Sequence, residues 1–184
     1  MSRIGFLPLP IPNKVTVTIG KDNVITVKGP LGELSQKVDP DIEVKIENNN
    51  MIVSRTTDQK RHKAMHGLYR RVLGNMVKGV SEGYVIEQEL VGVGYRAEAK
   101  GQILEMSLGY SHDIMMRLPA EVKVETKTEK RSNPIITLRS HDKQLIGFIA
   151  AKLRALREPE PYKGKGIRFV GENVRRKAGK TASV

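Results

Sequence analysis

The chain runs twice through one pattern of apolar and polar positions. In residues 14–57, short segments alternate apolar with polar side chains, which is the two-residue period of a half-buried β-strand, and turn-forming residues separate them. This pattern predicts strands around residues 15–19, 24–27, 42–46 and 51–55. An apolar stripe at three- and four-residue steps then predicts a helix through Met65, Leu68, Tyr69, Val72, Leu73 and Met76. We expect Thr57 or Asp58 to cap this helix and Gly79 to end it.

The second pass begins at Tyr84. Strand patterns recur at residues 85–90, 95–99, 103–108, 114–118, 122–124 and 135–138, and Lys100 and Gly101 form a turn between two of them. A second helix follows, for which we predict Ser140 as the cap and one apolar face made of Leu145, Ile149, Leu153 and Leu156.

The two passes align at an offset near 80 residues, which indicates a duplicated domain. Gly29 matches Gly109, and Gly67 falls on Gly147 inside the second helix. Because glycine costs about 1 kcal/mol relative to alanine inside a helix, the second match suggests close packing of helix on sheet. The predicted fold is α+β: two tandem copies of a small antiparallel sheet packed against one helix, with a basic C-terminal tail. The predicted boundaries are an N-terminal arm (1–13), a first repeat (14–82), a second repeat (83–158) and the tail (159–184).

Charge is the strongest signal in the composition. The chain has 32 Lys and Arg against 20 Asp and Glu, for a net charge of +12. Ten basic residues against three acids fall between Lys152 and Lys180, so +7 lies there. Such a field favours a polyanionic partner, first nucleic acid and second an anionic membrane surface. Aromatic residues are only 4% of the chain, and tryptophan is absent, which argues against a single-strand binder that stacks bases on aromatic platforms.

Several classes of protein are excluded by what the composition lacks. Without cysteine there are no disulfides, thiolate metal sites, iron–sulfur clusters or cysteine nucleophiles. No apolar run approaches the roughly 20 residues of a membrane helix, so no membrane partner is expected. Prolines at positions 8, 10 and 12 interrupt the start of the chain, so we expect no signal peptide and a protein that stays where it is made.

Three motifs have a catalytic or cofactor interpretation that their context disfavours. Residues 92–97 fit the dinucleotide pattern G-x-G-x-x-[GA], but that site requires a helix after the glycines, and a strand pattern continues here. Residues 140–142, Ser-His-Asp, are adjacent, whereas the members of a catalytic triad meet from separate parts of a fold. His62 and His66 have the spacing of a shared metal site, but basic neighbours disfavour a cation, and solvated histidines are the preferred interpretation. We therefore expect no enzyme activity, no cofactor and no metal.

The segment PEPYKGKGIR, residues 159–168, is the most informative one. Its prolines end the second helix, its glycines allow the backbone to approach a surface closely, and Lys163, Lys165 and Arg168 supply cations at short spacing. Binding to a phosphate backbone is the preferred interpretation, and a solvated charged tail is the alternative. The residues beyond, with Arg175, Arg176 and Lys177, are expected to be disordered until they meet a partner.

In this segment and elsewhere the chain resembles the bacterial-type ribosomal protein six family of the large subunit. The resemblance rests on MSRIG (1–5), KGPLG (28–32), NMVKGV (75–80), LVGVGYRA (90–97), SLGYSH (107–112) and PEPYKGKGIR (159–168). It covers nearly the whole chain, and the last motif is the most specific. Glu158 departs from the family, in which a base is common there, and this weakens the local positive field.

The resemblance implies a structural constituent of the cytoplasmic large ribosomal subunit, without catalysis. It implies binding to large-subunit ribosomal RNA near the sarcin–ricin loop and the region where translation GTPases bind, beside neighbouring large-subunit proteins. Residue types and matched motifs together give the expected RNA contacts: Arg154, Arg157, Tyr162, Lys163, Gly164, Lys165, Gly166, Arg168, Arg175, Arg176, Lys177 and Lys180. A dehydrogenase would instead need a helix after Gly94, and a DNA-binding module would need a helix that presents base-reading residues.

Overall fold

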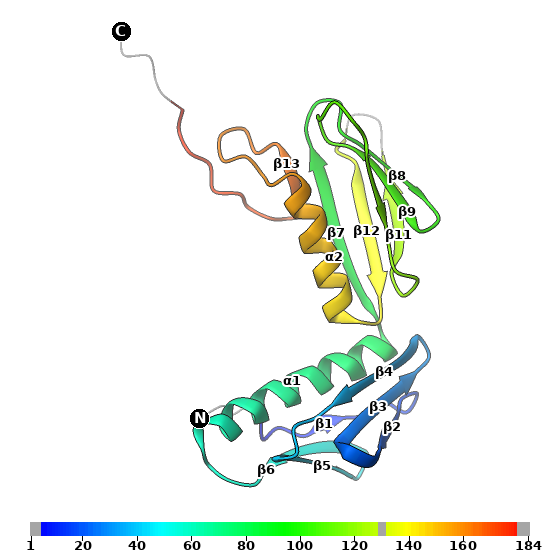
Figure 1. The fold of residues 1–184 in the computed structure, drawn as a ribbon, viewed down its shortest axis with the longest axis vertical. Coiled ribbons are helices and arrows are strands. Elements are labelled where there is room, and N and C mark those ends of the chain that lie inside the picture. The colour runs from blue at the N-terminus through cyan, green and yellow to red at the C-terminus, as the bar shows by residue number, and fades with distance from the viewer. Residues whose placement is uncertain (1–4, 129–131, 180–184) are drawn as a thin grey trace. The chain divides into compact units, whose positions relative to one another are not determined.

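A computed structural model describes residues 5–128 and 132–179, and its chain divides into two units (Figure 1). The first unit comprises the residues up to Tyr84 together with His141–Lys143. The second comprises Val85–Ser140 and the residues from Gln144 onward. Neither helix of the described residues is long and apolar enough to cross a membrane.

The first unit contains two small antiparallel sheets and one long helix. The elements in chain order are β1 (Leu9–Pro10), β2 (Thr16–Ile19), a 3-10 turn (Lys21–Asn23), β3 (Val24–Gly29), β4 (Gly32–Lys37), β5 (Ile42–Glu47), β6 (Asn50–Arg55) and α1 (Lys60–Ser81). One sheet has the order β2-β3-β4 and the other β1-β6-β5. The two inward residues of β3, Ile25 and Val27, are fully buried because the strand alternates apolar with polar positions.

Helix α1 closes this core by packing on β3, β4, β5 and β6. Its buried apolar residues, Leu73, Met76, Val77 and Val80, recur at three- and four-residue steps. At Gly29 the strand comes so close to the helix that an added Cβ would lie 2.6 Å from the Val80 carbonyl oxygen. The same carbonyl accepts a hydrogen bond from the Leu31 amide at 3.1 Å, so a glycine is needed at this contact.

The second unit has the same kinds of elements. They are β7 (Tyr84–Val91), β8 (Arg96–Lys100), β9 (Ile103–Ser107), β10 (Ile114–Arg117), β11 (Lys123–Lys127), β12 (Ile135–Ser140), α2 (Lys143–Leu156) and β13 (Gly166–Phe169). Its sheets have the orders β10-β9-β8 and β11-β12-β7-β13. The buried Gln88 side chain donates from Nε2 to the Ala150 carbonyl at 2.9 Å and so ties β7 to α2.

The strand orders show that the two units repeat one topology, strand for strand. The meander β2-β3-β4 corresponds to β8-β9-β10, and the order β1-β6-β5 corresponds to β7-β12-β11. In the chain, α1 follows β6 and α2 follows the corresponding strand β12. The α+β class is thus confirmed, with two small sheets in each unit, and the second unit has β13 as an added edge strand beside β7.

Several local predictions are wrong. Helix α1 begins after Gln59 without a side-chain cap, and it passes through Gly79 to end at Ser81. Gly83, at φ 81°, follows its end and donates its amide to the Lys78 carbonyl, which is the geometry of a glycine stop. In the second unit Ser140 is the last residue of β12 and α2 starts at Lys143.

Other differences concern faces and edges. The buried face of α2 is Ile146, Ile149, Ala150 and Leu153, so Ile146 takes the place predicted for Leu145. Gly147 faces open space, which contradicts the predicted close packing there. Strand β1 lies within the predicted N-terminal arm and β13 within the predicted tail, so both segments contribute to sheets.

Candidate nucleic-acid interface

The chain after α2 forms a tight loop that is fastened at its base. The Glu160 amide donates to the Lys165 carbonyl at 2.8 Å, and the Gly164 amide donates to the Glu160 carbonyl at 2.9 Å. Gly164 has φ 74°, a left-handed conformation that glycine adopts without strain. Directly after the loop, β13 pairs with β7, which places Gly166 opposite Val91. The loop therefore projects from a strand at a sheet edge.

Gly166 serves the protein's own packing rather than an external surface. A Cβ at this position would lie 2.5 Å from the Glu158 carbonyl oxygen. Next to it, the Ile167 amide donates to the Arg157 carbonyl at 2.8 Å, and the Ile167 side chain is fully buried. The close approach that we predicted for Gly166 thus occurs within the protein, between β13 and the segment that follows α2.

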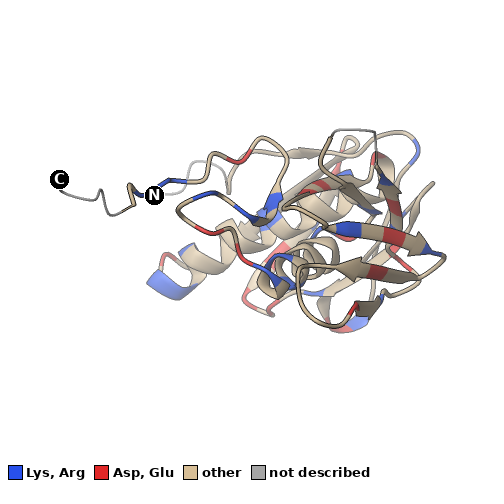
Figure 2. Ribbon diagram, turned by 90° about the horizontal axis from the view of Figure 1, so that it is seen from above, with Lys and Arg blue, Asp and Glu red and all other residues tan. Residues whose placement is uncertain are grey.

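The tail returns to this loop. The Lys177 amide donates to the Pro161 carbonyl at 2.8 Å, and the Arg176 guanidinium lies 3.8 Å from where a Gly164 Cβ would be. Two predicted groups of cations, separate in the sequence, are thereby brought together (Figure 2). We call the exposed basic residues of this region the loop–tail cluster: Lys163, Lys165, Arg175, Arg176 and Lys177.

The loop–tail cluster is a set of cations without counter-ions. No Asp or Glu of the described residues forms an ion pair with any member of it. Tyr162 stands beside it with 53% of its surface exposed. Lys180, which we also predicted at the interface, lies outside the described residues. A cluster of this kind can neutralise several phosphates at once.

Two of the predicted RNA contacts are instead engaged within the protein. The Arg168 Nε lies 2.6 Å from Glu89 Oε1, across the β13–β7 pair. The Arg154 guanidinium lies 2.7 Å from a Glu172 carboxylate oxygen, and the other oxygen of Glu172 accepts the Phe169 amide at 3.1 Å. Both arginines therefore stabilise β13 and the turn after it.

The histidines of α1 contradict the solvated interpretation. His66 is 1% exposed, with Nε2 2.8 Å from the Val53 carbonyl and Nδ1 3.1 Å from the Arg55 guanidinium. His62 is 9% exposed and lies 3.1 Å from an Asp41 carboxylate oxygen, and its Nδ1 is 2.7 Å from Thr57 Oγ1. The His66 ring thus connects α1 to strand β6, and the His62 ring connects α1 to the turn before β5 and to the loop after β6. No group of metal ligands occurs among residues 5–128 and 132–179.

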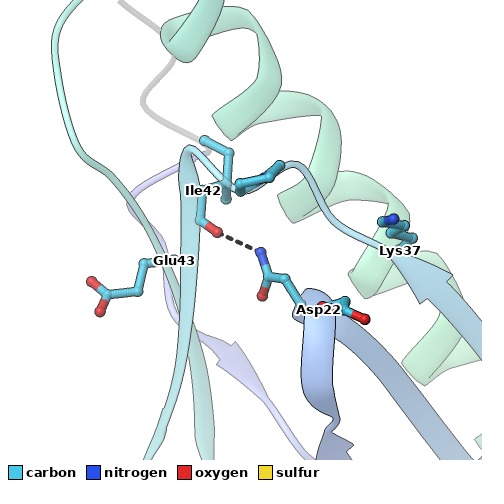
Figure 3. Close-up of a pocket in the computed structure, with 6 residues that line it drawn as sticks. Asp22, Lys37, Ile42 and Glu43 are labelled. Atoms are coloured by element: carbon cyan, nitrogen blue, oxygen red, sulfur yellow. Dashed lines mark hydrogen bonds between the residues drawn. The ribbon is translucent and has the colours of Figure 1, made fainter.

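The glycine motif at residues 92–97 and one hollow of the first unit do not have the features of a cofactor or anion site. Residues 92–95 form a turn between β7 and β8, so the helix that a dinucleotide site requires is replaced by a strand. A hollow in the first unit, shown in Figure 3, is lined by Asp22, Asn23, Lys37, Pro40, Ile42 and Glu43. The Asn23 side chain, which lines the hollow, donates from Nδ2 to the Ile42 carbonyl at 2.8 Å, drawn as the dashed line. The Asp22 and Glu43 carboxylates in the lining of the hollow disfavour an anionic ligand.

The fold and this surface define a class of protein: a basic, duplicated α+β protein that presents a cationic loop. Comparison with known proteins narrows the class. The model of the ribosomal protein L6 family matches residues 11–83 and 91–170. The chain is 60% identical to the large ribosomal subunit protein uL6 of Cytophaga hutchinsonii over 183 residues, which covers 100% of both chains. It is 62% identical to that of Parabacteroides distasonis, covering 99% of both, and 58% identical to that of Phocaeicola vulgatus, covering 99% of this chain and 98% of the relative.

The chain belongs to the ribosomal protein L6 family. A member of this family is a structural component of the large ribosomal subunit, which is cytoplasmic in bacteria, and it is not an enzyme. The predicted family is thereby confirmed.

Proposed function

We propose that this protein binds large-subunit ribosomal RNA through the loop–tail cluster, mainly at phosphates, and that it stabilises the RNA fold as a structural constituent of the subunit. The observation that carries the proposal is the convergence of Lys163, Lys165 and Arg176 on one loop, without counter-ions among the described residues. Neighbouring large-subunit proteins are the further partners expected of such a constituent.

The residue types favour phosphates over base edges. Lysine is a compact point charge without the planar fork that reads a base in two places, whereas arginine can fork onto a phosphate or stack. The loop is fixed at its base by backbone hydrogen bonds and by β13, so the lysines are presented without ordering the whole segment on binding. Phosphate contacts position a protein on RNA, which is the requirement of a scaffold.

The test is RNA binding measured as a function of salt concentration. Lys163→Ala/Lys165→Ala should lower affinity for isolated large-subunit RNA and flatten the slope of log affinity against log salt by about one to two units, since each phosphate contact contributes about 0.7–0.9. The matched control is Lys14→Ala/Lys21→Ala, which removes the same charge from exposed lysines of the first unit and should change the slope less. Circular dichroism of both variants should match the wild type.

Two outcomes would contradict the proposal. An unchanged affinity in the Lys163→Ala/Lys165→Ala variant would place the RNA footprint elsewhere. Equal losses in this variant and in the control would mean that net charge acts without a defined site.

The proposal extends to the place of the protein in the subunit. The family resemblance supports a position near the region where translation GTPases bind. Large subunits assembled with Lys163→Ala/Lys165→Ala protein should contain less of this protein and should bind a translation GTPase more weakly than subunits assembled with the control variant. Normal GTPase binding by subunits that lack the protein would refute this position.

A further inference from the structure

The second unit contains a group of aromatic side chains around one arginine that the phosphate proposal does not use. Arg157 is the first residue after α2, and its guanidinium lies 4.9 Å from the centre of the Tyr110 ring. The Tyr110 hydroxyl donates to the Leu156 carbonyl at 3.0 Å, and the His112 ring is stacked against Tyr110 with centroids 5.8 Å apart and an interplanar angle of 22°. We call Tyr95, Tyr110, His112 and Arg157 the aromatic–arginine cluster.

The cluster is built into the fold rather than assembled from loose surface groups. Tyr95 is 9% exposed and occupies space that two glycines leave open. A Cβ on Gly92 would lie 2.7 Å from the Tyr95 ring, and a Cβ on Gly109, which has φ 74°, would lie 3.2 Å from it. The motifs at residues 92–97 and 107–112 thus meet at the Tyr95 ring. Their glycines leave space for this ring and do not form a dinucleotide site.

The arginine lies against an aromatic ring and has no carboxylate partner in the described part of the chain. Its guanidinium is 4.9 Å from the centre of the Tyr110 ring, and the neighbouring Tyr110 and then Tyr95 raise the pKa of Arg157. No carboxylate of the described residues forms an ion pair with Arg157, in contrast to Arg154 and Arg168. The guanidinium therefore remains available for an anion.

The outer parts of the cluster are open to solvent. Tyr110 is 41% exposed, and His112 and Arg157 are exposed as well. The exposed Tyr110 and His112 rings, with the Arg157 guanidinium beside Tyr110, present π surfaces on which a nucleobase can stack whatever its identity. The cluster also adjoins the loop–tail cluster, because the Arg157 carbonyl accepts the Ile167 amide at the base of that loop.

We propose that the aromatic–arginine cluster is a second RNA subsite, which takes one unpaired nucleotide by stacking its base on the exposed rings and by contacting its phosphate through Arg157. This inference rests on the proposed function and deepens it. The loop–tail cluster holds phosphates, paired or unpaired, whereas this subsite requires a base that has left its helix. It therefore directs the protein to a loop, bulge or strand end of the RNA.

The experiment compares variants of the full chain in binding to large-subunit RNA at several salt concentrations. Tyr110→Leu removes the ring and should lower affinity about tenfold with an unchanged salt slope, because stacking releases no counterions. Arg157→Lys keeps the charge but loses the plane and should also lower affinity without changing the slope. Arg157→Ala should in addition flatten the slope by about 0.7–0.9. The matched control is Phe148→Leu, an exposed ring on α2 with the Lys152 ammonium 4.7 Å from its centre, which should bind like the wild type.

A second pair of measurements separates stacking from folding. Tyr110→Phe keeps the ring and loses only the hydroxyl, so it should retain most of the stacking, and His112→Ala leaves both tyrosines intact and should weaken binding. Tyr110→Leu should also lose the preference of the wild type for a single-stranded RNA over a duplex of equal charge. Binding of Tyr110→Leu and His112→Ala equal to that of Phe148→Leu would overturn the subsite. If Lys163→Ala/Lys165→Ala still weakens binding in that case, the proposed function stands and the subsite alone fails.

Discussion

Arg168 provides the sharpest test of the structure, because residue type and structure assign it different roles. As a basic residue of the glycine-rich segment it was predicted to contact RNA. In the structure it is paired with Glu89 across two neighbouring strands, at 2.6 Å, with side-chain exposures of 23% and 19%. The Arg168→Ala substitution should therefore reduce stability first and RNA binding second.

The expected loss in the free energy of unfolding depends on how far the Arg168–Glu89 ion pair is buried. Exposed ion pairs contribute about 0.2–1 kcal/mol, and removing one partner of a fully buried pair costs about 3–5 kcal/mol. A pair about one-fifth exposed lies between these limits. In addition, the second Glu89 oxygen keeps a hydrogen bond from Asn133 Nδ2 at 3.3 Å when the arginine is removed. We expect Arg168→Ala to cost about 2 kcal/mol and the coupling between the two residues to be about 1–1.5 kcal/mol.

The assay is a double-mutant cycle with Arg168→Ala, Glu89→Ala and the double variant, each unfolded by denaturant at low and high salt. Hydrogen exchange of the Ile167 and Phe169 amides in β13 gives a local readout, and exchange should accelerate in both single variants. In RNA binding, Arg168→Ala should flatten the salt slope less than Lys163→Ala does, since its charge is already neutralised. Coupling below about 0.3 kcal/mol together with a full loss of one phosphate contact in the salt slope would show that Arg168 leaves Glu89 to bind RNA.

Two further predictions concern backbone space and pH. Gly166→Ala places a Cβ 2.5 Å from the Glu158 carbonyl oxygen at φ 142°, so denaturant midpoints should show a loss of about 1–3 kcal/mol; an unchanged midpoint would mean that the loop base moves aside freely. The Asp41 amide and then Arg61 hold the pKa of Asp39 below its ordinary value of 3.8. The stability from Asp39 is therefore present above pH 3.8 and is lost as the pH falls through the lowered value, so Asp39→Asn should be less stable at pH 7 and lose less on acidification in thermal melts. A parallel pH dependence of variant and wild type would contradict this.

The sequence revealed the strands and helices that have one clearly apolar face. The alternation in β3, β5 and β6 follows directly from burial on one side. The predicted stripe on α1 is correct at Leu73 and Met76, which are buried, but wrong at Leu68, which is 51% exposed. The buried face of α1 also includes residues outside that stripe: His62, His66, Val77 and Val80. Strand β4 was missed because it contributes little to the core, with no fully buried residue and Leu34 as its one large apolar side chain. The end of α1 was misplaced because Gly79 tolerates a helical position, whereas Gly83 takes the left-handed one.

The sequence predicted the positive charge of the candidate site, but it did not predict which of the basic side chains form ion pairs within the protein. Lys163 and Lys165 are exposed at the predicted loop, as their glycine and proline neighbours indicated. The partner of Arg168 is set by the register of β13 on β7, which brings together residues 79 apart in the sequence. The partner of Arg154, Glu172, lies in the turn after β13. The four residues from Gly166 to Phe169 are too few for an apolar–polar alternation to predict a strand. They form one because they pair with the edge strand β7. The aromatic–arginine cluster depends in the same way on three distant segments meeting.

The added strand β13 shows how the two copies of one fold treat the same edge differently. In the first copy that edge is β1, a two-residue strand with Pro10 inside it and Pro8 and Pro12 on either side. Proline removes the amide that a further strand would bind, so this edge resists unwanted pairing with another chain. In the second copy the equivalent edge, β7, is longer and free of proline, and the chain covers it with β13. The two copies thus have equivalent edges with different fates: prolines block further pairing at β1, whereas β7 pairs with β13 and so anchors the basic loop.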